Sequence, residues 1–179
     1  MYPALRAIHG IAAGVLAPRV PLHEPYVTHH RVWPWDGDMY FELNHGRALT
    51  LFEVARWRWA AQTGFVTLFR KHRISFAVAG VSVRYRRRLP VFARYRVETR
   101  IVGWDEKFFY VVQSSWQGAE CAHQILVRAA LKSPRGTLPP AEVMVLAGEE
   151  PESPPMPDWV RAWIDAEATR PWPPERAGS

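Results

Sequence analysis

The chain has 179 residues, and its 48% hydrophobic and 13% aromatic content excludes a disordered or low-complexity protein. Its single cysteine, Cys121, excludes an intramolecular disulfide framework and favours a reducing compartment, so we expect a cytoplasmic protein. The formal net charge of +6 is uneven, since residues 70–100 hold ten Arg or Lys against one acid, but this charge by itself identifies no partner.

Residues 1–22 form the first segment, and their apolar stretch runs from Ala7 to Ala17. A bilayer span needs about 20 apolar residues, so we expect no integral membrane segment. Pro18 and Arg19 follow the stretch where a signal peptide would have small residues. The segment is therefore predicted to be an arm or short helix packed on the domain, with weak association with a membrane surface as the alternative.

The folding unit is predicted to span residues 23–133. Residues 25–33, "PYVTHHRVW", are rich in strand-forming residues. From Asn44 onward, apolar residues recur at helical spacing as far as Trp59, and Gly64 is a natural helix end. Asn44 is a good N-cap for this helix of roughly five turns.

Four strand-like runs follow the helix, at residues 74–89, 92–104, 107–117 and 119–133. The second run alternates in a regular way, which predicts two different faces for its side chains. The apolar face carries Tyr95, Val97, Thr99 and Ile101, and the charged face carries Arg94, Arg96, Glu98 and Arg100. Turn residues 103–106 and 117–118 lie where hairpins belong.

This order of one strand, one long helix and four antiparallel strands predicts an α+β fold. A solitary helix can bury its apolar stripe only against the sheet, which gives a curved antiparallel β-sheet wrapped around one long central helix, the hot-dog fold. Residues 134–179 are rich in proline and acidic residues. We expect them to form a tail on the surface, with a short helix at about Trp159 to Thr169.

Two stretches resemble a known family. Residues 36–56, "DGDMYFELNHGRALTLFEVAR", are similar to a pattern of D-x-D, five variable residues, N-N-x-R and a helix. Residues 84–110, "RYRRRLPVFARYRVETRIVGWDEKFFY", contain a basic strand, a turn and a G-W-D hairpin in the order found in the same family. Over residues 27–133 the chain resembles hot-dog-fold acyl-CoA thioesterases of the 4-hydroxybenzoyl-CoA thioesterase type, in their thioesterase-like branch.

The resemblance implies a catalytic role for Asp38, and it matches Asn44 and Arg47 to the asparagine and arginine of the pattern. Three positions depart from it, because Glu42, Leu43 and His45 replace the usual histidine, methionine and second asparagine. The resemblance also implies a homodimer or homotetramer built through the sheets. It implies an acyl-CoA substrate.

Thioester hydrolysis needs a nucleophile or activated water and a group that stabilises the oxyanion. The amides at the start of the helix, near Asn44 to Arg47, could polarise the carbonyl, with Gly46 allowing close approach. Asp38 would be the general base or the nucleophile, and the sequence leaves both open. The alternative is that Asp38 only caps a turn. Asp36 is interpreted as structural, either capping the turn or pairing with an arginine.

The remaining candidates have simpler alternatives. His45 is a candidate general acid or an exposed first-turn residue. The three arginines that could bind CoA phosphates could equally form a solvated face; they are Arg84, Arg86 and Arg87. His29 and His30 point to opposite faces of a strand, and zinc, P-loop and dinucleotide motifs are missing from the sequence, so we expect no metal and no cofactor.

The sequence therefore favours an acyl-CoA thioesterase with Asp38, Asn44 and His45 as catalytic candidates and Gly46, Arg47 and three arginines as substrate-binding candidates. A non-catalytic acyl-CoA or lipid-binding protein is the main alternative, supported by the changed residues Glu42 and His45. A nucleic-acid-binding surface on the basic strands ranks last, because no recognised nucleic-acid module is present.

Overall fold

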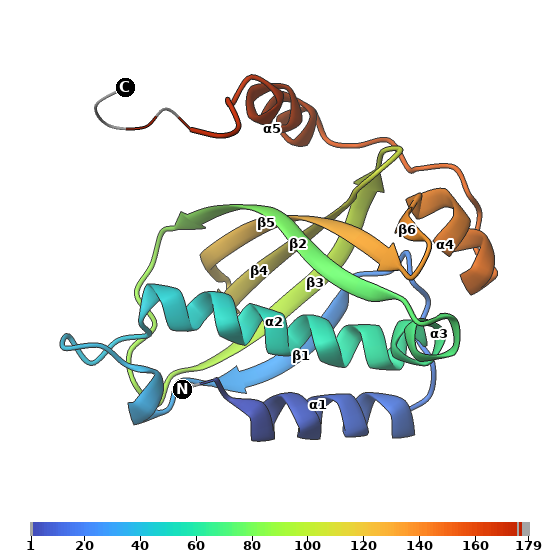
Figure 1. Cartoon of the computed structure of the whole chain (residues 1–179). Helices are drawn as coiled ribbons and strands as arrows, with labels where there is room; N and C mark the ends of the chain where they lie inside the picture. Colours follow the sequence, from blue (N-terminus) through green and yellow to red (C-terminus); the bar gives the residue numbers. More distant parts are fainter. Residues whose placement is uncertain (1, 175, 177–179) are drawn as a thin grey trace.

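The computed structural model describes residues 2–174 and 176 (Figure 1). One antiparallel sheet has the strand order β1-β3-β4-β5-β2, and β6 pairs with β5. Its strands are β1 (Tyr26–Arg31), β2 (Ser75–Tyr85), β3 (Arg94–Trp104), β4 (Phe109–Gln117), β5 (Glu120–Ser133) and β6 (Gly136–Leu138). The sheet curves around the long helix α2 (His45–Gln62), which confirms the predicted hot-dog fold.

Helix α2 packs its apolar stripe on the inner face of the sheet, as the helical spacing predicts. Leu51, Phe52 and Ala55 are buried there in one cluster with Val97 and Val127. Burying a Leu or Phe side chain contributes roughly 1.5–3 kcal/mol each, so this stripe fixes the helix on the sheet. The predicted alternation of β3 is also confirmed, because Tyr95 and Val97 are buried on the face toward α2.

A second helix, α3 (Phe65–His72), follows α2 and was not predicted from the sequence. Gly64 ends α2 as predicted, but its left-handed backbone, with φ of +90°, lets the chain turn and start α3 at once. Phe65 holds the new helix in place, since its ring meets Trp59 edge-on and stacks on Phe69.

Strand β2 is shorter than predicted. It ends at Tyr85, because the backbone N–H groups of Arg86 and Arg87 both donate to the carbonyl of Ala122 and so leave the regular ladder. The arginines beyond Tyr85 therefore belong to a connection and do not alternate as a strand would.

The C-terminal segment is more deeply packed than the surface tail that was predicted. The predicted short helix is confirmed as α5 (Asp158–Ala168), whose Val160 is buried against Tyr110 and Leu126 on the outer face of the sheet. Helix α4 (Pro140–Ala147) was not predicted, and it places Val143 and Met144 in a buried cluster.

The N-terminal segment forms α1 (Ala4–Leu16), in agreement with the short helix predicted there. It lies along the outer side of α2 (Figure 1). Small residues make the contact: a Cβ added at Gly14 would lie 2.7 Å from the carbonyl oxygen of Arg58. Among residues 2–174 and 176, no helix combines the length and apolar character needed to cross a membrane.

Candidate active site

The chain enters α2 through a tight hairpin formed by residues 37–43. Gly37 and Leu43 form a bridge, and the backbone N–H of Asp38 donates to the carbonyl of Glu42 at 2.9 Å. The hairpin is held from outside as well, because Leu43 N–H donates to the carbonyl of Leu89 at 2.8 Å. The loop therefore presents its residues from a fixed backbone.

Asp38 lies at the first position of the hairpin turn. Its Oδ1 accepts a hydrogen bond from the backbone N–H of Tyr40 at 2.9 Å, and its carbonyl accepts from Phe41 N–H at 3.1 Å. Within the described part of the chain, Oδ2 has no hydrogen-bond partner, and the side chain is half-buried. Asp38 thus caps a turn with one oxygen and keeps the other available for chemistry.

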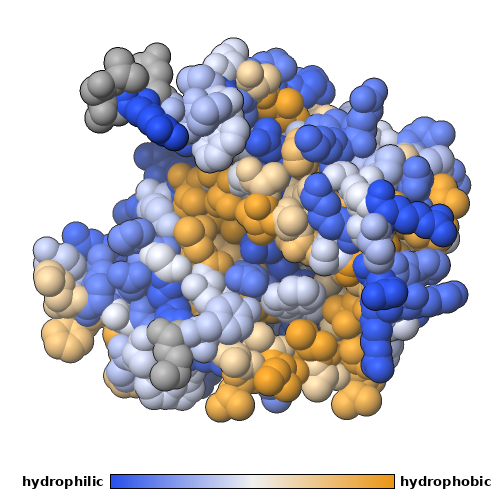
Figure 2. All heavy atoms as spheres, in the orientation of Figure 1, coloured by the Kyte–Doolittle hydropathy of each residue, from blue (hydrophilic) through white to orange (hydrophobic). Residues whose placement is uncertain are grey.

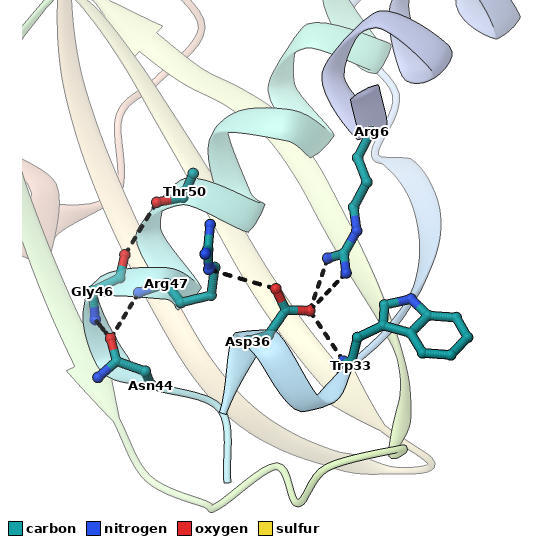
Figure 3. A network of polar contacts seen from close by, with 7 residues as sticks. All are labelled: Arg6, Trp33, Asp36, Asn44, Gly46, Arg47 and Thr50. Carbon is teal, nitrogen blue, oxygen red and sulfur yellow. Dashed lines mark hydrogen bonds and ion pairs between the residues drawn. The ribbon is translucent and has the colours of Figure 1, made fainter. Parts of the chain in front are cut away.

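Asp36 is the structural aspartate of the pair, as the sequence indicated. It is buried, and its Oδ2 accepts from Trp33 N–H at 3.0 Å and lies 2.8 Å from both terminal nitrogens of Arg6 (Figure 3). Its Oδ1 lies 3.5 Å from Nε of Arg47. Asp36 both caps the turn and pairs with arginine, so it links α1, the hairpin and the first turn of α2.

Asn44 is the N-cap of α2, as predicted. Its Oδ1 accepts from the backbone N–H of Gly46 at 3.0 Å and of Arg47 at 3.1 Å (Figure 3), while Ala48 N–H donates to its carbonyl. These bonds use three of the first four amides of the helix. The remaining one, His45 N–H, has no acceptor among the described residues.

The helix start therefore offers fewer backbone amides for an oxyanion than the sequence suggested. The partial positive charge of the helix N-terminus remains, but one amide, His45 N–H, can donate to a substrate carbonyl without displacing the cap. Gly46 has an ordinary backbone conformation, and a Cβ there would meet Oδ1 of Asn44 at 3.3 Å. Arg47 turns inward to Asp36, away from solvent.

Two residues beside this helix start were not assigned to it from the sequence. Tyr85 Oη donates to the carbonyl of His45 at 3.0 Å, and its ring meets those of His45 and His123 edge-on. His123 is buried, its Nε2 lies 3.1 Å from the carbonyl of Arg87, and burial lowers its pKa. The β2–β5 register brings Tyr85 opposite His123, and the sequence contains no signal for that pairing.

The basic residues near the end of β2 divide into two groups. Arg87 forms an exposed ion pair with Glu120 at 3.4 Å, and Arg88 pairs with Glu42 at 3.3 Å. Arg84 and Arg86 are exposed and have no carboxylate partner in the described residues. Arg86 directly follows Tyr85, whose Oη reaches His45 at the start of α2. Arg84 lies on the opposite face of β2 from Tyr85, in a groove with Leu126 and Trp159.

A cavity of about 140 Å³ lies between α2, α3 and strands β2 to β5. Its aromatic and aliphatic lining includes Trp59, Phe65, Phe69, Phe76, Phe109 and Leu131. An apolar cavity of about 150 Å³ is large enough for a benzene ring, so this one has room for an apolar group of that size.

Two charged side chains, Glu53 and Arg56, line the cavity wall, and the sequence did not single out either of them. Arg56 Nη1 donates to Oε1 of Gln113 at 2.5 Å, and burial lowers the pKa of Arg56 to about 10. Gln113 in turn donates to Phe52 O and to Thr99 Oγ1, at 3.0 and 2.9 Å. This network crosses from α2 to the middle of the sheet.

Histidine and acid clusters of the metal-binding kind do not occur among residues 2–174 and 176. His30 faces inward, where it stacks on Tyr95 and contacts Thr28 Oγ1 at 2.7 Å, and burial lowers its pKa to about 4. His29 is exposed whereas His30 is half-buried, which agrees with the predicted alternation of faces along β1.

Comparison with known proteins adds three findings. A sequence profile described as the thioesterase-like superfamily matches residues 32–164. Protein THEM6 of Xenopus laevis is 31% identical over 136 residues, which cover 74% of this chain and 64% of that protein. The chain thus spans less than two thirds of the length of this relative, and 63% and 43% of the THEM6 proteins of Drosophila melanogaster and Danio rerio.

Solved structures share the fold at lower identity. A probable thioesterase from Bartonella henselae has a TM-score of 0.59 and 22% identity, covering 65% of this chain and 98% of that one. YbaW, a probable thioesterase from Escherichia coli, has a TM-score of 0.63 and 18% identity, covering 67% and 94%.

Proposed function

Because the chain belongs to the thioesterase-like superfamily, we propose that it is an acyl-CoA thioesterase, which hydrolyses a fatty or aryl acyl-CoA to the free acid and CoA. One observation carries the proposal. Among the described residues, the amide of His45 at the positive end of α2 has no acceptor, and Oδ2 of Asp38, in the hairpin that leads into the helix, has no hydrogen-bond partner.

The reaction needs two events at the thioester carbonyl. Its oxygen accepts a hydrogen bond from His45 N–H, which stabilises the negative charge that develops there. Asp38 either removes a proton from a water molecule that attacks the carbonyl carbon, or attacks that carbon itself to form an anhydride that water then hydrolyses. In both routes the C–S bond breaks and CoA leaves as a thiolate, which then takes up a proton.

We place the two ends of the substrate on opposite sides of that point. The cavity is lined by the part of α2 from Glu53 to Ala60, about 12–22 Å along the helix from His45, so a long acyl chain places its far end there. Arg86 binds CoA phosphates near the helix start, whereas Arg84 lies on the other face of β2 and takes no part. Arg47 and Arg87 were predicted to bind substrate as well, but each already pairs with a carboxylate. In this proposal Asn44 acts by capping the helix, and His45 acts through its backbone.

The test is CoA release, followed with a thiol reagent, from short, long and aromatic acyl-CoAs. Asp38→Asn should lower kcat by about 100-fold or more, the usual contribution of a general base. The asparagine keeps an oxygen that can accept from Tyr40 N–H, so the hairpin is preserved. A wild-type protein that releases no CoA from any substrate would reject the proposal.

Non-catalytic acyl-CoA binding is the second candidate. Two observations favour it. Asp38 already accepts a hydrogen bond within the turn through Oδ1. Glu42, which replaces the usual histidine of the family pattern, pairs with Arg88. It predicts that wild type and Asp38→Ala bind acyl-CoA equally and that neither releases CoA.

We also propose a cytoplasmic homodimer or homotetramer. Strand β2 is an edge of the sheet, eleven residues long, with Val78 and Val81 exposed on it. Long edges with exposed apolar residues pair readily with another chain, and pairing of two β2 strands would join the sheets. Light scattering of the purified protein measures the mass directly, and a monomer would contradict this part.

A further inference from the structure

Helix α1 presents its large apolar side chains to solvent. Leu5, Ile8, Val15 and Leu16 are 84%, 63%, 53% and 86% exposed. At about 100° per residue these four positions fall within one stripe about 100° wide. Figure 2 shows apolar surface along the lower edge of the molecule, where Figure 1 places α1.

The buried side of the same helix is made of small residues. Ala7, Gly10 and Gly14 face α2, so the helix packs closely by its backbone and turns its larger residues outward. An ordinary surface helix has the opposite arrangement, with large apolar residues inside and polar residues outside. The stripe is therefore suited to a partner that offers an apolar environment.

Basic groups border this stripe on one side. A groove between α1 and β1 is lined by residues of both elements and by Arg58 of α2, without an acidic residue. Its polar lining consists of Arg6, His9, His29, His30, Arg31 and Arg58, with Trp33 beside them. The sequence itself has no acid before Glu24.

The basic border continues onto the outer face of the sheet. In the β1–β3 register Arg31 lies opposite Arg94, and His29 lies opposite Arg96. Like charges opposite one another destabilise a sheet unless a counter-charge is present. Arg96 pairs with Glu98, but within the described ranges neither Arg31 nor Arg94 has a carboxylate at ion-pair distance.

We propose that α1 docks this protein on the surface of an anionic lipid bilayer. The helix lies in the plane of the interface with its four exposed side chains among the acyl chains, and Arg31 and Arg94 bind headgroup phosphates. Charge favours this occupant over a second copy of the chain, which would bring the same basic border and a further +6 to the contact. The docking does not depend on thioester hydrolysis.

Sedimentation of the full chain with vesicles tests the proposal. Wild type should bind vesicles of phosphatidylcholine and phosphatidylglycerol more tightly than vesicles of phosphatidylcholine alone. Leu5→Ser with Leu16→Ser should weaken partitioning about tenfold or more, since burial of even one leucine corresponds to about tenfold. Arg94→Gln should weaken it about fivefold, the usual effect of one basic residue near an anionic surface.

Two matched controls separate this result from a general loss of apolar or basic surface. Val145→Ser with Leu146→Ser removes exposed apolar side chains of α4, and Arg100→Gln removes an exposed arginine from the same face of β3 as Arg94. Each control should stay within about twofold of wild type. Circular dichroism checks that every variant is folded.

Two outcomes would overturn the proposal. The first is a set of controls that weaken vesicle binding as much as the α1 variant does. The second is an α1 variant that changes the mass measured by light scattering while wild type binds no vesicle, which would make the stripe a contact between two copies.

Discussion

Arg6 and Asp36 are thirty residues apart in the sequence, and in the structure Nη2 of Arg6 donates to Oδ2 of Asp36 at 2.8 Å. The pair fastens α1 to the hairpin that precedes α2. Since Asp36 is buried and Arg47 approaches its other oxygen, the hairpin depends on one carboxylate for its attachment to two helices.

Asp36→Asn should therefore destabilise the fold. Removing one partner of a buried ion pair costs about 3–5 kcal/mol, and partial exposure of Arg6 reduces this to about 2–3 kcal/mol. Urea unfolding measures the change in the free energy of unfolding. Asp38→Asn, in the same hairpin, is the control and should change stability by less than about 0.5 kcal/mol. Equal effects of the two substitutions would contradict the assignment of structure to Asp36 and chemistry to Asp38.

His45→Pro should remove the oxyanion amide without removing the helix. Proline is favoured at the first position of a helix, and Asn44 already has the extended backbone, with ψ of 134°, that a following proline requires. Loss of one oxyanion donor should lower kcat by about 100- to 1000-fold with little change in KM.

His45→Ala is the matched variant for this test, because it keeps the amide and removes the imidazole. If it retains wild-type kcat, the ring has no role as a general acid. If alanine lowers kcat as much as proline, the ring and not the amide is the important group.

Gly14→Ala should loosen α1, whereas Gly10→Ala should not. A Cβ at Gly14 would lie 2.7 Å from Arg58 O and 2.8 Å from Ala61 Cβ, so the helices would have to separate. At Gly10 the nearest atom would be 3.6 Å away, and alanine should stabilise the helix by about 0.5–1 kcal/mol. Hydrogen exchange of the α1 amides measures both effects, and faster exchange in both variants would count against this packing.

Ala60→Leu should change substrate preference if the cavity holds the acyl group. Ala60 lines the 140 Å³ cavity, and the larger side chain would fill much of it. We expect kcat/KM to fall at least about tenfold for long-chain acyl-CoA, because overpacking costs about 1–3 kcal/mol. It should change little for acetyl-CoA or an aryl acyl-CoA, whose acyl groups are too short to reach the cavity from His45. An equal fall for all substrates would place the acyl group elsewhere.

Stability should fall as the pH is lowered from about 6.5 to about 4. Burial lowers the pKa of His30 from 6.5 to about 4, so in this window the unfolded chain binds a proton that the folded chain does not. The loss from this residue is about 3 kcal/mol, and His123, whose pKa is also lowered, acts in the same direction. The free energy of unfolding of His30→Gln should depend less on pH across the window than that of wild type, and parallel profiles would contradict this origin.

Several features followed from local sequence. The period of apolar residues after Asn44 predicted α2, and the alternation in β3 predicted which side chains face the core. Asn44 as the N-cap and Gly64 as the helix end were also recognised, because each depends on the chemistry of one residue and its immediate neighbours. Two aspartates in one loop could likewise be separated into a structural and a chemical candidate.

Other features depended on contacts between distant segments. The pairing of Arg6 with Asp36, of Arg56 with Gln113 and of Tyr85 with His45 joins residues 30 to 57 positions apart, and no local pattern encodes such pairs. Helix α4 was missed because its proline-rich flanks are typical of a loop. Its stability depends on the burial of Val143 and Met144 in the core, which the local sequence does not show. Only the tertiary structure showed that, in the described part of the chain, the cap at Asn44 leaves His45 N–H without an acceptor, since the hydrogen bonds of a backbone group depend on which groups surround it in the folded protein.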